Sequence, residues 1–393
     1  MNLDKAGLDS LDLKSNRVLM RVDFNVPRDD AGAITDDTRI RAALPTIQAV
    51  LAAGGQPILM SHLGRPGGEE RDDLRLDAIG ERLRELLDVP VIKLDESEGS
   101  EAEMGVADTE DLVLLENVRF HPGETKGDPR LASGFARLGD VFVNDAFGAS
   151  HRDHASVSGV ARVLPSAAGL LLKAEIDAFR RVLDAPARPF AAVLGGAKVS
   201  DKLPVIENLL DKVDRILIGG GMAYTFVVAR GGQVGGSLFQ ADQLELVRGL
   251  DAKAKEKGVE ILIPTDHVIG DGFAADCTAK TVVGDIPDGW MGLDIGPESQ
   301  AAYAAALADC ETIVWNGPMG VFEWDAFQAG TAAVGRAIAD ASAYSVVGGG
   351  DSVAAAAKFG LTDSMSHIST GGGASLELLE GKELPGIACL PDA

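Results

Sequence analysis

The segment RILIGGG at positions 215–221 shows the pattern on which the fold prediction rests. Ile216, Leu217 and Ile218 form a continuous apolar run, which is typical of a strand buried on both faces of a parallel sheet. Three glycines follow at once and end the run. Along the chain, similar short apolar runs alternate with Ala- and Leu-rich stretches of helical character. Strands and helices that alternate in this way predict βαβ units and parallel sheets, and therefore an α/β fold.

The same pattern places the individual elements. We expect strands at Arg17–Asp23, Gln56–Met60, Asp111–Leu115, Asp140–Val143, Pro189–Leu194, Arg215–Ile218, Val259–Ile263, Thr312–Trp315 and Ser345–Val347. We expect helices over stretches that include Arg39–Ala53, Leu76–Leu87, Lys202–Leu210, Ala241–Lys257 and Ser299–Leu307.

The strands fall into two sets, before and after about residue 170, which predicts two domains. Leu170–Leu183 has apolar residues near one stripe and reads as a single amphipathic helix. The sequence DAPARP at 184–189 then breaks the chain. We expect an N-terminal domain over 1–170, an interdomain helix and linker over 171–186, and a C-terminal domain over 187–383.

Composition excludes several classes of protein. The chain has 393 residues, of which 46% are hydrophobic and 24% charged, so it is expected to be globular. Its net charge of −24 disfavours binding to nucleic acid or to an anionic membrane. We hypothesise that the excess of Asp and Glu is an adaptation to salt-rich surroundings, where it would be screened.

The expected location is the cytoplasm. Cys277, Cys310 and Cys389 form no C-x-x-C pair, which argues against a disulfide framework and fits a reducing compartment. The first ten residues are charged and lack the apolar core of a secretory signal. No apolar run reaches the length that a membrane-spanning helix needs.

Cationic residues lie at or near the strand or helix ends of the first half. They are Arg39, Arg65, Arg119 and Arg152, together with His62. Because the carboxyl ends of parallel strands meet at one edge of a sheet, these side chains are expected to lie close together. Arginine matches carboxylate and phosphate with two parallel hydrogen bonds, so the first half predicts a site for a small phosphorylated or carboxylated anion. Asp23 and Asn25 lie at the end of the first apolar run, where they fit a simple strand-end turn as well as they fit a binding site.

The second half has glycine-rich turns instead. Its strands lead into GGAKVSDK at 195–202 and into glycine triplets at 219–221 and 348–350, and a third triplet at 371–373 follows His367–Ser369. Glycine lets backbone N–H groups approach a phosphate, and a helix N-terminus adds partial positive charge, so we expect a nucleotide polyphosphate site. Lys198 and Lys202 are spaced to share one helix face, and Asp351 is a natural Mg²⁺ ligand. The alternative is that the glycines only form tight turns. The chain has no G-x-x-x-x-G-K-[ST] phosphate loop.

Taken together, these segments resemble the phosphoglycerate kinase family. The matching motifs occur in the family's order over essentially the whole chain: RVDFNVP (21–27), SHLGRP (61–66), LLENVRF (114–120), NDAFGASHRDHAS (144–156), GGAKVSDK (195–202), GGGMA (219–223), GLDIGP (292–297), WNGPMGVFEW (315–324), GGGDS (348–352) and STGGGASLELLEGK (369–382). The resemblance implies two Rossmann-like, doubly wound parallel-sheet domains that face each other across a cleft and are joined by a helix. It also implies a monomer whose C-terminal tail, 384–393, packs back on the first domain.

The resemblance implies a set of site residues as well. 3-Phosphoglycerate would bind at Asp23, Phe24, Asn25, Arg39, His62, Leu63, Gly64, Arg65, Arg119 and Arg152. ATP would bind at Gly195, Lys198, Lys202, Gly219, Gly292, Pro318, Glu323, Gly349, Gly350, Asp351 and Ser352. Arg39, Lys198, Lys202 and Gly350 would act in catalysis, and Asp351 would hold Mg²⁺. Ser352 departs from the threonine of many members but keeps the hydroxyl.

The implied reaction is Mg²⁺-dependent, reversible phosphoryl transfer between ATP and the carboxylate of 3-phosphoglycerate, a step of glycolysis. The expected mechanism is direct in-line transfer after hinge-bending closure of the domains. Two alternatives stay open at this point. One is a kinase of another small carboxylate, and the other is a non-catalytic protein that keeps the fold.

Overall fold

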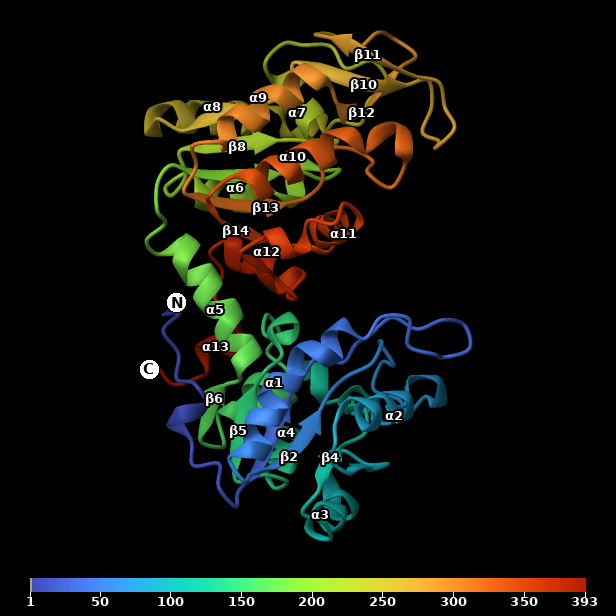
Figure 1. Cartoon of the computed structure of the whole chain (residues 1–393), viewed down its shortest axis with the longest axis vertical. Coiled ribbons are helices and arrows are strands. Elements are labelled where there is room, and N and C mark those ends of the chain that lie inside the picture. Colours follow the sequence, from blue (N-terminus) through green and yellow to red (C-terminus); the bar gives the residue numbers. More distant parts are fainter. Residues whose placement is uncertain (1) are drawn as a thin grey trace. The chain divides into compact units, whose positions relative to one another are not determined.

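The computed structural model describes residues 2–393 and forms two compact units (Figure 1). The first unit contains the chain up to Asp177 together with Glu383–Ala393. The second contains Ala178–Lys382. Helix α5 (Leu170–Leu183) begins in the first unit and ends in the second. Within the described residues, no helix is both long enough and apolar enough to cross a membrane.

The first unit is built on a six-stranded parallel sheet of order β3-β4-β2-β1-β5-β6. Its strands are β1 (Arg17–Arg21), β2 (Gln56–Met60), β3 (Val91–Lys93), β4 (Leu112–Leu114), β5 (Val141–Asn144) and β6 (Ser166–Ala168). Its helices are α1 (Thr38–Ala52), α2 (Asp77–Leu86), α3 (Gly99–Ala107), α4 (Pro129–Ala136) and α13 (Pro385–Ala388). The chain leaves β1 for β2 on one side and later reaches β5 on the other, so the carboxyl ends of these strands surround the point where ligands bind in such sheets.

The hydrophobic core of the first unit explains why these strands are central. Val18 and Met20 of β1, Leu59 of β2 and Leu114 of β4 are fully buried. Helix α1 contributes Ile47, among others, to the same cluster. Leu19, Ile58 and Val113, which point to the opposite face of the same strands, are also fully buried. Both faces of the middle strands are therefore covered, as their continuous apolar runs predict.

The segment Glu383–Ala393 packs on the first unit through specific polar contacts. The buried Lys5 Nζ donates to the carbonyl oxygen of Leu390 at 3.0 Å and pairs with Asp392 at 2.8 Å. Asn144 Nδ2 at the end of β5 donates to the carbonyl oxygen of Gly386 at 2.8 Å. These bonds join parts of the sequence more than two hundred residues apart.

The second unit repeats the design with a sheet of order β15-β14-β13-β7-β8-β9, again parallel. The strands are β7 (Phe190–Leu194), β8 (Arg215–Ile218), β9 (Glu260–Leu262), β13 (Thr312–Asn316), β14 (Tyr344–Val347) and β15 (His367–Ile368). The helices are α6 (Leu203–Leu209), α7 (Met222–Ala229), α8 (Leu244–Lys257), α9 (Pro297–Leu307), α10 (Ala329–Asp340), α11 (Gly350–Lys358) and α12 (Gly373–Leu379). Trp315 of β13 is fully buried in its core.

A second, three-stranded sheet is the main feature that the sequence pattern does not reveal. Strands β10 (Asp266–Gly270), β11 (Ala279–Val283) and β12 (Met291–Ile295) pair antiparallel in the order β11-β10-β12. β11 is largely exposed, so it lacks the apolar run used to find strands. Each strand that the sequence predicts is present, with ends that differ by at most two residues. The α/β fold class with two parallel-sheet domains is confirmed.

Candidate functional site

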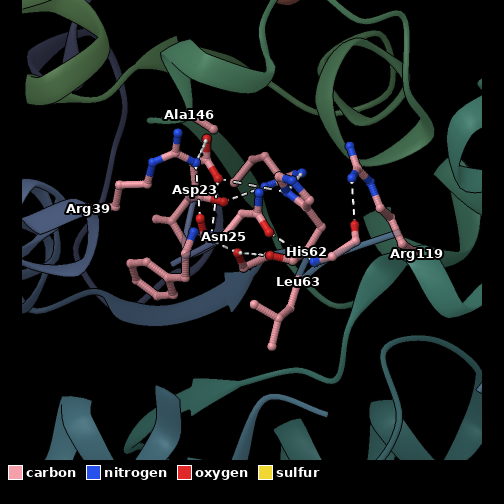
Figure 2. Close-up of polar contacts among 12 residues, drawn as sticks. Asp23, Asn25, Arg39, His62, Leu63, Arg119 and Ala146 are labelled. Atoms are coloured by element: carbon pink, nitrogen blue, oxygen red, sulfur yellow. Dashed lines mark hydrogen bonds and ion pairs between the residues drawn. The ribbon is translucent and has the colours of Figure 1, made fainter. Parts of the chain in front are cut away.

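The arginine-rich edge of the first unit lies at the carboxyl ends of β1, β2 and β4 (Figure 2). Arg39, in the first turn of α1, donates from Nη1 to Asp23 Oδ2 and to the carbonyl oxygen of Asn25, both at 3.2 Å. Asn25 Oδ1 accepts the backbone N–H of Gly64 at 2.8 Å. The strand-end turn after β1 is therefore tied to both α1 and the loop after β2, and it holds Arg39 at the edge.

Arg119 belongs to the same edge and has unused hydrogen-bonding capacity. Its Nη1 donates to the carbonyl oxygen of Gly64 at 2.8 Å. Its buried Nε has no hydrogen-bond partner among residues 2–393. Burial, followed by repulsion from Arg21, lowers the pKa of Arg119 to about 10. A buried donor beside other cations is the arrangement that an anionic ligand would complete.

His62 and Asp23 lie together among these arginines, with 3.9 Å between His62 Nδ1 and Asp23 Oδ1. Burial, with repulsion from neighbouring arginines, holds the pKa of His62 well below its usual value. Burial opposes ionisation of Asp23, but His62, Arg39 and Arg21 outweigh it and lower the pKa of that carboxyl. At neutral pH the edge therefore carries a neutral imidazole, an ionised carboxylate and several guanidinium groups.

Other predicted residues are placed differently. Phe24 and Leu63 are buried in the hydrophobic core, so their side chains pack rather than face a ligand. Arg65 and Arg152 are exposed, and neither side chain forms a hydrogen bond within residues 2–393. Arg65 lies near enough to Arg119 to lower its pKa. Within residues 2–393, no hydrogen bond or ion pair joins the Arg152 side chain to the other residues of the set.

The glycine-rich edge of the second unit lies at the carboxyl ends of β7, β8, β13 and β14. Several glycines there are required by close packing of loops. A Cβ on Gly195 would lie 1.9 Å from the carbonyl oxygen of Pro318, and one on Gly219 would lie 2.4 Å from Met319 Sδ. Gly350 has open space around it instead. Tight turns thus account for Gly195 and Gly219, while the start of α11 is free to receive a ligand.

Lys202 and Asn316 meet at this edge. Lys202 Nζ donates to Asn316 Oδ1, and the buried Nδ2 of Asn316 has no hydrogen-bond partner within residues 2–393. Nδ2 lies beside Gly349, where a Cβ would be only 3.1 Å from it. Burial lowers the pKa of Lys202, and Asp201 and Asp351 oppose that shift. The amide of Asn316 was not predicted as a site residue, although the motif WNGPMG contains it.

Lys198 and Lys202 do not share one helix face, so that prediction is wrong. A short 3₁₀ turn, Val199–Asp201, lies between them, and α6 begins only at Leu203. Proline at 204 stands in the first turn of α6 and fits a helix that begins there. Lys198 is exposed and Lys202 is half-buried.

Asp351 stands in the first turn of α11, and Ser352 beside it accepts the backbone N–H of Gly317 through Oγ at 2.5 Å. The Asp351 carboxylate is exposed and accepts no hydrogen bond from residues 2–393. Within that range, no three His, Cys, Asp or Glu side chains converge to hold a metal on their own. One carboxylate plus nucleotide phosphates is the usual Mg²⁺ environment, so the residues present fit this ion.

An apolar pocket of about 650 Å³ adjoins the glycine-rich edge. Asp351, Pro318 and Glu323 line it together with an apolar set that was not predicted: Tyr224, Leu238, Phe239, Phe273, Leu293 and Val321. Phe273 and Leu238 are 67% and 54% exposed, which is unusual for large apolar side chains. A pocket with an apolar end and a glycine-rich end suits a flat base joined to phosphates.

Each unit has a parallel sheet flanked by helices, with a cationic edge in the first unit and a glycine-rich edge in the second. This arrangement defines a two-domain α/β protein of the phosphotransferase type. The family described as phosphoglycerate kinase matches residues 8–382. Proteins named phosphoglycerate kinase from Synechococcus elongatus and Acaryochloris marina are each 56% identical over 395 residues, which cover 99% of this chain and 98% of theirs.

Solved structures of the same family are also similar to this chain. The phosphoglycerate kinase of Coxiella burnetii superposes with a TM-score of 0.90 at 42% identity, and that of Pyrococcus horikoshii with 0.80 at 33% identity, each covering 98% of both chains. The chain belongs to the phosphoglycerate kinase family. The predicted enzyme class is therefore confirmed, and the substrates of this family are 3-phosphoglycerate and ATP or ADP.

Proposed function

We propose that the arginine-rich edge of the first unit binds 3-phosphoglycerate and that the glycine-rich edge of the second binds the nucleotide. The observation that carries the proposal is Arg119, whose buried Nε lacks a partner within residues 2–393 and lies beside other cations. A chain of net charge −24 that gathers arginines in one place provides strong local attraction for an anion. Arg65 and Arg152 are proposed to close on the substrate from the exposed side.

The proposed chemistry needs no general base. The carboxylate of 3-phosphoglycerate, with an ordinary pKa of about 4, is already ionised at neutral pH. Its oxygen forms a bond to the γ-phosphorus of ATP while the bond from that phosphorus to the bridging oxygen breaks, and the electron pair leaves with ADP. Catalysis then consists of positioning and charge stabilisation. Transfer requires a state in which the two bound substrates meet.

The proposed roles follow from where each group lies. Within residues 2–393, Arg39 is held by one of its guanidinium nitrogens, which leaves the others to stabilise charge on the phosphoryl group in transfer. Lys202 and the exposed Lys198 hold phosphates, together with backbone N–H groups at Gly350 and its neighbours in α11. Asp351 would hold Mg²⁺, which when bound offsets the charge of the nucleotide phosphates.

We also propose that the enzyme acts as a monomer in the cytoplasm, without nucleic-acid or membrane partners. The high negative charge supports the absence of such partners. Analytical ultracentrifugation of the purified chain checks the monomer, and a sedimentation coefficient that rises with concentration would contradict it.

A coupled assay tests the proposed function directly. The enzyme is given ATP, Mg²⁺ and 3-phosphoglycerate, and oxidation of NADH by glyceraldehyde-3-phosphate dehydrogenase reports 1,3-bisphosphoglycerate. We expect turnover that requires all three components. Turnover with another small carboxylate but none with 3-phosphoglycerate would favour a different substrate.

The Arg65→Ala variant tests the assignment of the two edges. Loss of one exposed ligand to an anion is expected to raise the KM for 3-phosphoglycerate by roughly tenfold and to leave the KM for ATP unchanged. Arg130→Ala, which removes another exposed arginine of the first unit, is the matched control. A change confined to the KM for ATP would show that the two edges have been assigned the wrong way round.

A further inference from the structure

Three buried polar residues next to the arginine-rich edge have no assigned role. Arg21, at the end of β1, Ser156 and Glu124 are each 0% exposed. Their side chains form a continuous chain of contacts that reaches His62 (Figure 2 shows the His62 end). Because Arg21 is fully buried, it cannot itself contact a substrate.

The direction of every hydrogen bond in this chain is fixed by chemistry. Arg21 has only donors, so its Nε donates to Ser156 Oγ at 2.8 Å. The Ser156 hydroxyl then donates to Glu124 Oε1 at 2.6 Å, and its backbone N–H donates to Oε2 at 2.9 Å. At the other end, Arg21 Nη2 lies 3.1 Å from His62 Nδ1, and it must be the donor there too.

A ring nitrogen that accepts a hydrogen bond carries no proton. His62 Nδ1 is therefore the acceptor, and the proton of the neutral imidazole resides on Nε2. Nε2 forms no hydrogen bond within residues 2–393, so its N–H is available to a ligand. The opposite tautomer would present a lone pair on Nε2, which would repel an anionic oxygen.

We propose that Arg21 is a positioning residue that holds His62 as the Nε2–H tautomer, so that His62 donates a hydrogen bond to the bound anion without carrying charge itself. Ser156 and Glu124 hold the Arg21 guanidinium in the orientation that this requires. The inference rests on the proposed function, because it takes 3-phosphoglycerate as the anion that His62 meets.

Charge balance explains why Glu124 belongs to the set. A buried guanidinium without a counter-ion would be strongly destabilising. Burial raises the pKa of Glu124, but His154, Arg21 and Ser156 outweigh it, so the carboxyl is ionised at neutral pH. His154 Nδ1 lies 3.6 Å from Glu124 Oε1. Glu124 thus supplies the negative charge that keeps Arg21 in place while Arg21 directs its remaining donors to His62 and to the carbonyl oxygen of Val22.

The test reads the His62 tautomer in the free enzyme by long-range ¹H–¹⁵N correlation at pH 7.5, with the His62→Gln spectrum used for assignment. The wild type is expected to show the Nε2–H form. Arg21→Lys and Ser156→Ala are expected to give a mixture of tautomers and to raise the KM for 3-phosphoglycerate by about five- to tenfold, with the KM for ATP unchanged.

Ser158→Ala is the matched control, because Ser158 is equally buried in the same segment but contacts Asp153 and the backbone instead. It is expected to leave both the tautomer and the KM unchanged. If Arg21→Lys does not fold, the Ser156→Ala variant, which removes a single hydroxyl, decides the question.

Two outcomes overturn the inference. One is a wild-type His62 that is protonated on Nδ1. The other is a Ser156→Ala enzyme with the wild-type tautomer and the wild-type KM. A separate titration with 3-phosphoglycerate tests the proposed substrate site. If the His62 signals of an active enzyme do not shift in this titration, the site is contradicted. The role of Arg21 is tested independently by the His62 tautomer of the free enzyme.

Discussion

Arg39 is restrained on one side and free on the other. Its Nη1 binds both Asp23 and the backbone of Asn25, while the side chain stays 38% exposed. This combination suits a group that must be in position before the phosphoryl group arrives. We expect Arg39→Ala to lower kcat by roughly two to three decades with little change in either KM, because the lost contact is made mainly in the transition state.

Steady-state kinetics with both substrates varied measures this effect. Arg41→Ala is the control, since Arg41 lies on the same helix but points to Asp37 and is 54% exposed. A full-rate Arg39→Ala enzyme would remove Arg39 from the catalytic role.

Asp351 allows a prediction for the metal. We expect Asp351→Asn to raise the Mg²⁺ concentration for half-maximal rate by roughly tenfold or more, because an amide is a weaker ligand than a carboxylate. A Mg²⁺ titration at saturating ATP and 3-phosphoglycerate measures this. Asp363→Asn, which changes an exposed carboxylate outside the pocket, is the control. An unchanged Mg²⁺ dependence would show that Asp351 is not a ligand.

At the residue scale, the sequence predicted the site residues that lie near strand or helix ends. It did not predict the residues that come into contact only when the chain folds. Arg39 and Arg119 could be placed at one edge because both lie near strand or helix ends. Arg21 was predicted only as a residue within the strand Arg17–Asp23, of which it is the last residue in the structure, and Glu124 lies on a short 3₁₀ turn. Only tertiary contact brings these two together, so no spacing in the sequence could reveal the pair.

The first turn of helix α5 is capped by side chains from other elements. Asp145 Oδ1 accepts the N–H groups of Leu171 and Leu172 at 3.0 and 3.2 Å, and Thr46 Oγ1 accepts that of Leu170 at 3.1 Å. Three backbone donors that a helix start leaves open are thereby satisfied. Helix α5 is thus fixed to both β5 and α1 of the first unit.

The contribution of this cap to the free energy of unfolding depends on pH. Burial raises the pKa of Asp145 to about 7, whereas the carboxyl ionises near pH 4 in the unfolded chain. Between these values the folded state binds the extra proton, so the stability that this group contributes is present at low pH and declines as pH rises toward 7. From pH 5 to pH 8, it lowers the free energy of unfolding by about 2–3 kcal/mol.

The Asp145→Asn variant lacks this titration. We therefore expect the difference in unfolding free energy, variant minus wild type, to increase by about 2–3 kcal/mol between pH 5 and pH 8. Urea unfolding followed by circular dichroism measures it, and Asp184→Asn, at an exposed position, is the control. The same difference at both pH values would contradict the prediction.

At the element scale, most of the parallel sheets could be predicted because their strands are continuous apolar runs that end in glycine or small polar residues. β3, β6 and β15 were missed because their sequences, VIK, SAA and HI, hold at most two consecutive apolar residues. The antiparallel sheet was missed because its strands are partly exposed and form no such runs. The positions of the glycine-rich turns were predicted, whereas the packing that demands Gly195 depends on the facing loop.

The whole molecule carries a large excess of negative charge. With 60 acidic and 36 basic residues, the repulsion between carboxylates opposes the compact state and weakens as salt shortens the screening length. We expect the thermal unfolding midpoint to rise by about 3–10 °C when KCl is raised from roughly 0.05 M to roughly 1 M. Differential scanning calorimetry measures this, with sucrose at matched osmolarity as the control. A midpoint that is flat or falls with KCl would refute the salt-adaptation hypothesis.

The attachment of Glu383–Ala393 to the first unit has a consequence for the order of synthesis. Lys5 and Asn144 cannot make their contacts with this segment until Glu383–Ala393 has left the ribosome. Ala178–Lys382 is by then already translated in full. The second unit can therefore finish folding first. The first unit, although its synthesis starts earlier, is completed last.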